Sequence, residues 1–277
     1  MTVTGGAVTP AKVARLAFPV GDTLTVEPDV PSRMRLAIAV LFAIVTGLLP
    51  KTARAHEASS APDPMVLSVP GFPDAYYVKP RSKARREVIL YLHGRGGNAF
   101  EDCRKWARVA RIFGWVVCPQ GPTPTDTGGR TWNNDPGSAK RIVDATLAAL
   151  GQKYPGRVRS RGNILIGFSE GAFVAQQIGM RDPVHFSRWL ILAANDRYWF
   201  GDASQLLEEN HSKIRRVYLL TGENDHVAEN TKKAGEMLKT AHIRVRVKIE
   251  PGMGHEVPAD RMITNYRRPL RWLVAAH

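Results

Sequence analysis

The stretch "ILIGFSEGAF", residues 164–173, places Ser169 between Gly167 and Gly171, directly after a run of aliphatic side chains. The aliphatic run predicts a buried strand, and "EGAFVAQQIGM" after it predicts an amphipathic helix. A serine at a sharp strand-to-helix turn is typical of a nucleophile, and side chains at the two glycine positions would collide with the strand or the helix. A helix N-cap serine fits the same letters. The motif therefore needs support from the rest of the chain.

Strand-like and helix-like segments alternate on both sides of this turn. Strands are predicted at 65–69, 75–79, 87–93, 115–119, 163–168, 189–194, 216–222 and 244–250. Helices are predicted at 99–112, 138–153, 170–181, 203–210, 229–241 and 260–276, the last split or kinked at Pro269. Several strands are continuous apolar runs, which are typical of strands covered on both faces. We therefore expect an α/β fold: a mostly parallel sheet of about eight strands with helices on both faces.

Two further segments place an acid and a base at the same edge of that sheet. Asp225, in "TGENDHV", follows the strand 216–222, and His255, in "PGMGHEVP", follows the last strand. A serine hydroxyl becomes an effective nucleophile when a base and an orienting acid accompany it. The chain order Ser, Asp, His is the one expected for a serine at this type of turn. We predict a triad with Ser169 as nucleophile, His255 as base and Asp225 as the acid that orients it.

Other titratable residues compete for these roles. His226 adjoins Asp225 but is expected to point away from it, and Asp196 after the strand 189–194 is an alternative acid. His93 is expected to be a structural hydrogen-bonding residue rather than a base. The histidines, cysteines and carboxylates show neither an H-E-x-x-H motif nor close Cys/His spacing, so we expect no metal and no cofactor.

The loop "YLHGRGGN", residues 91–98, follows the strand 87–93 and is rich in glycine. Its open backbone lies at the predicted carboxyl edge, where N–H groups can stabilise negative charge that develops on a carbonyl oxygen. We therefore predict that this loop, with Gly94 and Arg95, contributes to an oxyanion hole.

The series "LHGRGG", "CPQGP" followed by Trp132, "GFSEGA", "TGENDHV" and "GMGHEVP" resembles the compact carboxylesterase, lysophospholipase and acyl-protein thioesterase branch of the α/β-hydrolases. The resemblance spans roughly residues 86–265. It implies that Ser169, His255 and Asp225 act as nucleophile, general base and orienting acid. It also implies that the N–H groups of Arg95 and Glu170 form the oxyanion hole.

Two positions depart from that pattern. Where the branch usually has Gln after the serine, this chain has Glu170, and where it usually has an apolar residue after His-Gly, this chain has Arg95. An unpaired carboxylate beside a developing oxyanion would oppose catalysis. We therefore expect an ion pair between Arg95 and Glu170 across the mouth of the site, and its burial would make it expensive to break.

Aromatic residues near the expected site have two interpretations. Trp132 and Trp199 either pack loops onto the edge of the sheet or form walls of a substrate pocket. The segment between the strands 189–194 and 216–222 is short and holds one short helix. We therefore expect no large lid.

The N-terminal region is predicted to be a targeting segment. Residues 36–49, "LAIAVLFAIVTGLL", are an uncharged apolar run of 14, followed by "ARA" at 53–55. These features predict a signal peptide at 34–55 with cleavage before His56, and hence a secreted or periplasmic protein. A stable membrane span is not expected, because it needs about 20 apolar residues.

Residues 1–33 are then an upstream, non-structural extension, with Met34 as the true start, 56–64 a linker and 65–277 the catalytic domain. Residues 1–55 hold six of the 39 basic and three of the 25 acidic residues, so residues 56–277 have a net charge of +11. That charge favours anionic surfaces or a plain solvated basic surface. No finger, RRM-like or basic-helix pattern occurs, so no nucleic-acid partner is expected.

Export would allow a disulfide between Cys103 and Cys118, the only two cysteines. The predicted heights of the two residues match, but their side-chain directions are open, so two buried thiols are an equal alternative.

From these residues we expect an exported serine hydrolase, best described as a carboxylesterase for short or medium acyl esters. A lysophospholipase or a polyester depolymerase is the alternative, for which the basic surface would help adsorption. A serine peptidase and a non-catalytic binding protein on the same scaffold are weaker interpretations. Acyl and leaving-group preference and oligomeric state are left open by the sequence.

Overall fold

The computed structural model of this protein describes residues 62–198 and 202–275. The predicted extension (1–33), the predicted signal peptide (34–55) and most of the linker (56–64) lie outside these residues. Within the described ranges, no helix is both long and apolar enough to cross a membrane.

A single eight-stranded sheet runs through the described domain, with strand order β1-β2-β4-β3-β7-β8-β9-β10. Every neighbouring pair is parallel except β1–β2 and β2–β4. All eight predicted strands are therefore confirmed: β1 (Met65–Leu67), β2 (Ala75–Val78), β3 (Val88–Leu92), β4 (Trp115–Cys118), β7 (Ile164–Phe168), β8 (Arg188–Leu192), β9 (Arg216–Gly222) and β10 (Val245–Glu250).

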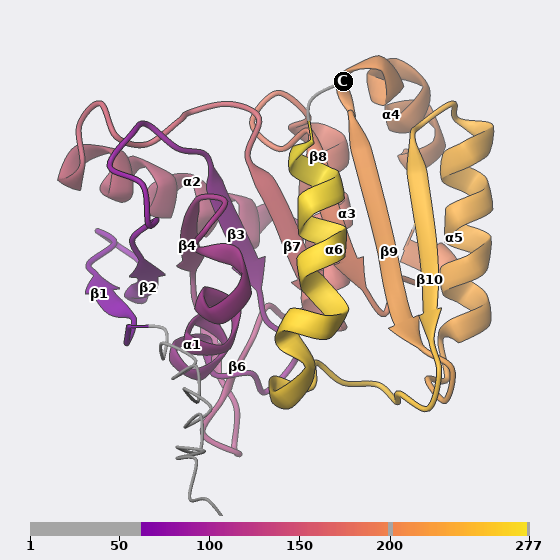
Figure 1. The fold of residues 1–277 in the computed structure, drawn as a ribbon, viewed down its shortest axis with the longest axis horizontal. Coiled ribbons are helices and arrows are strands. Elements are labelled where there is room, and N and C mark those ends of the chain that lie inside the picture. Colours follow the sequence, from indigo (N-terminus) through magenta and orange to yellow (C-terminus); the bar gives the residue numbers. More distant parts are fainter. Residues whose placement is uncertain (1–61, 199–201, 276–277) are drawn as a thin grey trace, which may run out of the picture. The chain divides into compact units, whose positions relative to one another are not determined.

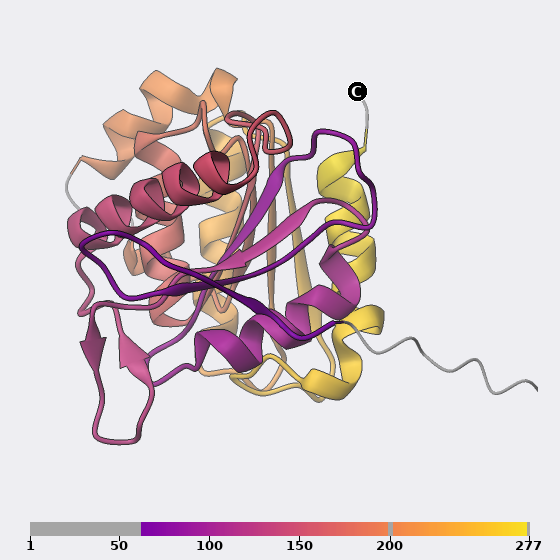
Figure 2. The ribbon, with the colours of Figure 1, turned by 90° about the vertical axis from the view of Figure 1, so that its left-hand side faces the viewer.

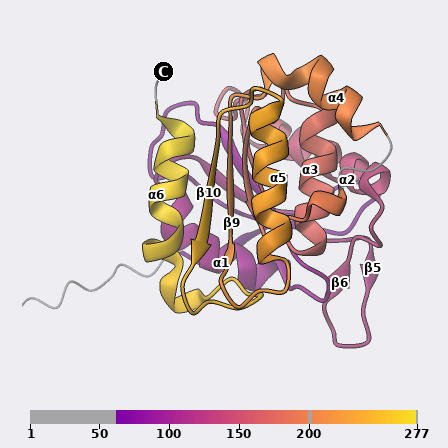
Figure 3. The ribbon, with the colours of Figure 1, turned by 90° about the vertical axis from the view of Figure 1, so that its right-hand side faces the viewer.

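Helices cover both faces of the sheet, as the side views show (Figure 2, Figure 3). One face is covered by α1 and α6, which contact each other, and the other by α2, α3 and α5, with α4 packed on α3. Each face buries its own hydrophobic cluster, so the strands are apolar on both sides. The bounds are α1 (Ala99–Ala110), α2 (Pro136–Lys153), α3 (Glu170–Arg181), α4 (Ala203–Asn210), α5 (Ala228–Thr240) and α6 (Met262–Val274).

Local capping determines where two of these helices begin. The side chain of Asn98 accepts hydrogen bonds from the N–H groups of Phe100 and Glu101, which fixes the start of α1 directly after the glycine-rich loop. Asp135 caps α2 in the same way, ahead of Pro136 in its first turn. The last helix, α6, is continuous through Pro269, so of the two expectations, a split or a kink, the split does not occur.

The carboxyl ends of the parallel strands lie at the lower edge in Figure 1. A small hairpin, β5 (Thr123–Pro124) with β6 (Arg130–Thr131), lies near this edge within the Pro/Gly/Thr-rich loop (Figure 3). The sequence did not predict this hairpin. Between β8 and β9 the described chain forms only two 3-10 turns and α4. The expectation of no large lid therefore holds for the described residues.

Both cysteines are buried free thiols. The Cys103 thiol donates to the carbonyl oxygen of Tyr76, 3.5 Å away. Burial raises the pKa of the Cys118 thiol well above its ordinary value, so this thiol stays protonated and unreactive. Of the two alternatives left open by the sequence, the structure shows the free thiols.

Candidate active site

Ser169 lies at the turn between β7 and α3, in a backbone conformation that L-residues rarely adopt. Its φ is 54° and its ψ is −118°, and such a conformation persists only where the surrounding structure enforces it. A Cβ at Gly167 would overlap the carbonyl oxygen of Gly171, and a Cβ at Gly171 would overlap that of Leu92. Both glycines are therefore required by close packing, as the sequence predicted.

The Ser169 hydroxyl does not cap α3, although Ser169 occupies the N-cap position. Its Oγ lies 2.9 Å from Nε2 of His255 instead. The N-cap interpretation is therefore wrong, and the hydroxyl is held beside a base. Ser169 is partly exposed, and the His255 side chain is 32% exposed, so solvent reaches both groups.

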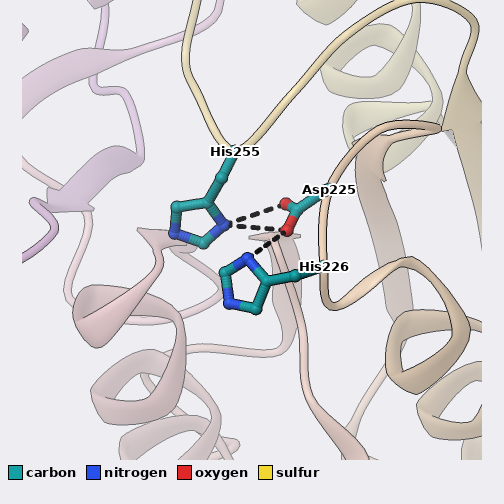
Figure 4. Close-up of side chains that lie close together, drawn as sticks. All are labelled: Asp225, His226 and His255. Atoms are coloured by element: carbon teal, nitrogen blue, oxygen red, sulfur yellow. Dashed lines mark hydrogen bonds and ion pairs between the residues drawn. The ribbon is translucent and has the colours of Figure 1, made fainter. Parts of the chain in front are cut away.

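Asp225 and His255 come from the loops that follow β9 and β10, and these loops meet at the carboxyl edge (Figure 4). His255 Nδ1 lies 2.9 Å from Oδ2 and 3.0 Å from Oδ1 of Asp225. A carboxylate only accepts, so Nδ1 carries the proton and Nε2 is left to accept from Ser169. The structure thus brings the three predicted triad residues together in one hydrogen-bonded chain.

The Asp225 carboxylate is itself firmly held, with a side chain that is 1% exposed. Thr221 Oγ1 donates to its Oδ2 at 2.5 Å, and the Val227 N–H donates to its Oδ1 at 3.0 Å. Burial alone would raise the pKa of Asp225, but the hydrogen bonds from Thr221, Val227 and His255 hold it below the ordinary value. The sequence analysis did not identify Thr221 as a hydrogen-bond partner of Asp225. The signal that could have identified it is its position near the end of β9, four residues before Asp225.

This lowered pKa predicts a pH dependence of stability. Because folding lowers the pKa, ionised Asp225 stabilises the protein above the ordinary carboxyl pKa of about 3.9, and this contribution is lost as pH falls through the folded-state value. We expect the free energy of unfolding of wild type to exceed that of Asp225→Asn at pH 7 and the difference to shrink toward pH 3. Urea denaturation of both proteins across that range measures it. A difference that stays constant with pH would contradict the assignment.

His226 occupies a position that the sequence did not predict. Its Nδ1 lies 3.3 Å from Oδ1 of Asp225, and its ring packs against that of His255 with centroids 4.9 Å apart (Figure 4). The expectation that His226 points away from Asp225 is therefore wrong. Because its side chain is 75% exposed and Ser169 is contacted by His255, the structure does not place His226 as the base.

These contacts also create the one grouping, among the described residues, of three side chains with metal-ligand atoms close together. The ligand atoms of Asp225, His226 and His255 lie within 4.8 Å of one another. Imidazole nitrogen and carboxylate oxygen are ligands that Zn²⁺ accepts. The sequence contained no spacing that would reveal such a group, because the histidines lie 29 residues apart on different loops. A metal bound there would compete with the hydrogen bonds that hold His255.

The glycine-rich loop lies directly against Ser169. A Cβ added to Gly94 would be 3.3 Å from the Cβ of Ser169. Among the described residues, no acceptor binds the backbone N–H of Arg95 or of Glu170. The predicted contributors to an oxyanion hole are therefore next to Ser169, with two donors unused by the protein.

The His93 side chain holds this loop in place through two hydrogen bonds. Its Nε2 accepts from the Gly121 N–H at 3.0 Å, so its Nδ1 carries the proton and donates to the Gly94 carbonyl at 2.8 Å. Burial lowers the pKa of His93, which keeps the ring neutral and this tautomer intact. His93 is thus a structural residue, as the sequence predicted.

The Glu170 carboxylate accepts hydrogen bonds from several donors, whereas the sequence predicted Arg95 as its one partner. The predicted ion pair with Arg95 is present, at 3.3 Å, but the Arg95 side chain is 62% exposed and the Glu170 side chain only 4% exposed. Thr131 Oγ1 donates to the carboxylate at 2.8 Å, and the N–H groups of Trp132 and Asn134 donate at 3.1 and 3.2 Å. The expectation of a buried pair is therefore wrong for Arg95, and Glu170 is anchored chiefly to the end of β6 and the loop that follows it.

Trp132 and Trp199 are the two tryptophans that the sequence suggested as walls of a substrate pocket. The Trp132 side chain is fully buried, donates its indole N–H to the His93 carbonyl at 2.9 Å and stacks on the His93 ring. The prediction that Trp132 binds substrate is therefore wrong, because its ring packs the loop and presents no surface. Trp199 lies outside the described residues. Asp196, the alternative acid, accepts from Asn230 at 2.6 Å and is thereby tied to α5.

Comparisons with known proteins found structural likeness alone. No family model and no curated protein matches the sequence. Esterase PE8 aligns with a TM-score of 0.53 at 24% identity, over 72% of this chain and 97% of that chain. FphF, a fluorophosphonate-binding serine hydrolase of Staphylococcus aureus, aligns with a TM-score of 0.58 at 12% identity, over 77% and 98%. An S-formylglutathione hydrolase from Agrobacterium tumefaciens aligns with a TM-score of 0.55 at 18% identity, over 72% and 88%.

These neighbours share the architecture found here. That architecture is a mostly parallel sheet with helices on both faces. All the identities are below 25%, so the likeness concerns the fold. The chain has the α/β-hydrolase fold.

Proposed function

We propose that this protein is a serine hydrolase, and specifically a carboxylesterase that cleaves short or medium acyl esters. The observation that carries the proposal is the hydrogen-bonded chain from Ser169 Oγ through both nitrogens of His255 to Asp225, with distances of 2.9 Å on each side. A side chain held at this strained turn has no evident structural purpose, because its hydroxyl caps nothing. An activated nucleophile explains both features.

In this reaction Ser169 Oγ attacks the ester carbonyl carbon while its proton passes to Nε2 of His255. The imidazolium that forms is stabilised by Asp225, whose lowered pKa keeps it ionised at neutral pH. The same proton then passes to the departing alcohol, and the acyl group stays on Ser169. A water molecule, deprotonated by His255, releases the acid and restores the serine.

The free N–H groups of Arg95 and Glu170 would hold the negative charge on the carbonyl oxygen during both steps. Removing one such donor in other hydrolases costs about 10²–10³ in kcat. Here the donors are positioned by their own side chains, because Glu170 is bound by the end of β6 and the loop that follows it, and Arg95 reaches back to Glu170. The donors that bind the Glu170 carboxylate also offset part of its negative charge.

A covalent probe tests this function directly. We expect a fluorophosphonate to label the purified protein, with the adduct found by mass spectrometry on Ser169 alone, and Ser169→Ala to stay unlabelled although folded. The reason is that only an activated serine attacks the phosphorus atom. A folded wild-type protein that takes no label would refute the hydrolase and favour a non-catalytic binding protein.

Substrate class and export are finer parts of the same proposal. The partly exposed Ser169 and the short cover between β8 and β9 support small esters. A series of p-nitrophenyl esters from acetate to palmitate is expected to show highest kcat/KM for the shorter acyl groups, whereas a long-chain optimum would favour a lipid or polyester substrate.

Export predicts that protein secreted by an expression host begins at His56, which the same mass spectra report. An earlier start would refute the proposed cleavage.

A further inference from the structure

A separate cavity of about 630 Å³ lies at the opposite edge of the sheet from Ser169. Its lining includes Arg188 and Arg216, the first residues of β8 and β9, and Gly162, which lies just before β7. Ser169 follows the far end of β7, and a five-residue strand spans roughly 16 Å. The cavity is therefore distinct from the candidate active site, and nothing in the proposed esterase mechanism uses it.

The lining of this cavity is strongly basic. Among the described residues it contains one carboxylate, Glu87, which lies 3.4 Å from Arg188 and 3.8 Å from Arg159. In the part of the chain that the structure describes, no ion pair joins a carboxylate to Arg161, Lys213 or Arg215. The full set of cations that line the cavity is Arg159, Arg161, Arg188, Lys213, Arg215 and Arg216.

These cations repel one another. Burial lowers the pKa of Arg188, Glu87 partly offsets this effect, and the charges of Arg215 and Arg159 lower the pKa again. Like charges held together in a partly desolvated site raise the free energy of the folded protein. A bound anion would relieve that repulsion.

Buried polar atoms in the lining also lack partners. Ser187 is 5% exposed, and its Oγ makes no hydrogen bond with any described residue; the same holds for Nε of Arg188. Buried polar atoms normally have a partner, and an unsatisfied one costs free energy. These unpaired buried atoms add to the free-energy cost of the folded protein beside the clustered cations.

We propose that this cavity binds a small molecule that carries two or more phosphate groups. Guanidinium groups pair with phosphate oxygens through two parallel hydrogen bonds, which makes clustered arginines the chemistry of phosphate recognition. The volume lies within the range of small-molecule sites, roughly 300–1,000 Å³. A single phosphate carries at most about two negative charges, fewer than the three positive charges of Arg161, Lys213 and Arg215, which no described carboxylate offsets, so the charge favours a multiply charged ligand.

Inorganic pyrophosphate serves as the probe, measured by isothermal titration calorimetry at fixed ionic strength. We expect binding to wild type and a loss of affinity of at least about tenfold in Arg161→Gln/Arg215→Gln, because each exposed arginine would contribute a charge-assisted hydrogen bond. The control is Lys232→Gln/Lys233→Gln, which removes the same charge from α5, a helix that does not line the cavity. Its affinity for pyrophosphate is expected to stay within about twofold.

Every outcome of this comparison bears on the proposal. Equal weakening in both double variants would show general attraction to a basic protein and overturn the site. No heat of binding to wild type, together with binding to vesicles of phosphatidylglycerol, would assign the basic surface to a membrane instead. Thermal denaturation without pyrophosphate checks that the variants fold, and in wild type pyrophosphate is expected to raise Tm. Neither readout depends on ester hydrolysis.

Discussion

Replacing His255 with alanine is expected to lower kcat for ester hydrolysis by about 10⁴- to 10⁶-fold. The reason is that Ser169 Oγ then loses the only described side chain that accepts its proton, 2.9 Å away. The loss should appear in kcat more than in KM, because His255 acts on the transition state. Steady-state kinetics with p-nitrophenyl acetate, corrected for non-enzymatic hydrolysis, measures the change.

His226→Ala is the matched control for this experiment. Both histidines contact the Asp225 carboxylate and their rings pack together, yet only His255 is in contact with Ser169. We expect His226→Ala to retain activity within about tenfold, a change of less than 1.4 kcal/mol in the barrier. If the two variants lost activity equally, His255 would not be the sole base and the proposed proton path would be wrong.

The second large effect is expected at Glu170. Glu170→Gln should lower the free energy of unfolding by about 2–4 kcal/mol, because the amide NH₂ would face donors where the carboxylate oxygen accepted. The donors concerned are Thr131 Oγ1 and the N–H groups of Trp132 and Asn134. Urea denaturation followed by tryptophan fluorescence measures the loss.

The variant Arg95→Gln measures the contribution of the ion pair alone, because it leaves the other hydrogen bonds to Glu170 in place. Arg95 is mostly exposed, so its pair with Glu170 is screened by water, and we expect a cost below about 1 kcal/mol. A larger loss in Arg95→Gln than in Glu170→Gln would restore the ion pair as the main interaction. In both variants kcat also reports on the oxyanion hole, because the N–H groups of residues 95 and 170 stay in place only while their loops do.

Much of this architecture could be predicted from local patterns. Apolar runs and alternating patterns of five to seven residues predicted every strand of the main sheet, and the ends of those strands placed Ser169, Asp225 and His255 at one edge. The β5–β6 hairpin escaped prediction because its strands have two residues each and are set by contacts with the glycine-rich loop. The sequence left Trp132 open between loop packing and a pocket wall, because a loop tryptophan has no periodicity that reports its depth.

The amino-acid sequence by itself determined the order of elements, the strained serine turn and the identity of the residues brought to the carboxyl edge, since these depend on short-range periodicity and glycine placement. Only the tertiary structure decided which histidine reaches Ser169, how Glu170 is satisfied and that six cations line one cavity. Those features depend on side-chain directions across loops and strands far apart in the chain. No local pattern encodes such directions, because they are set by packing against distant segments.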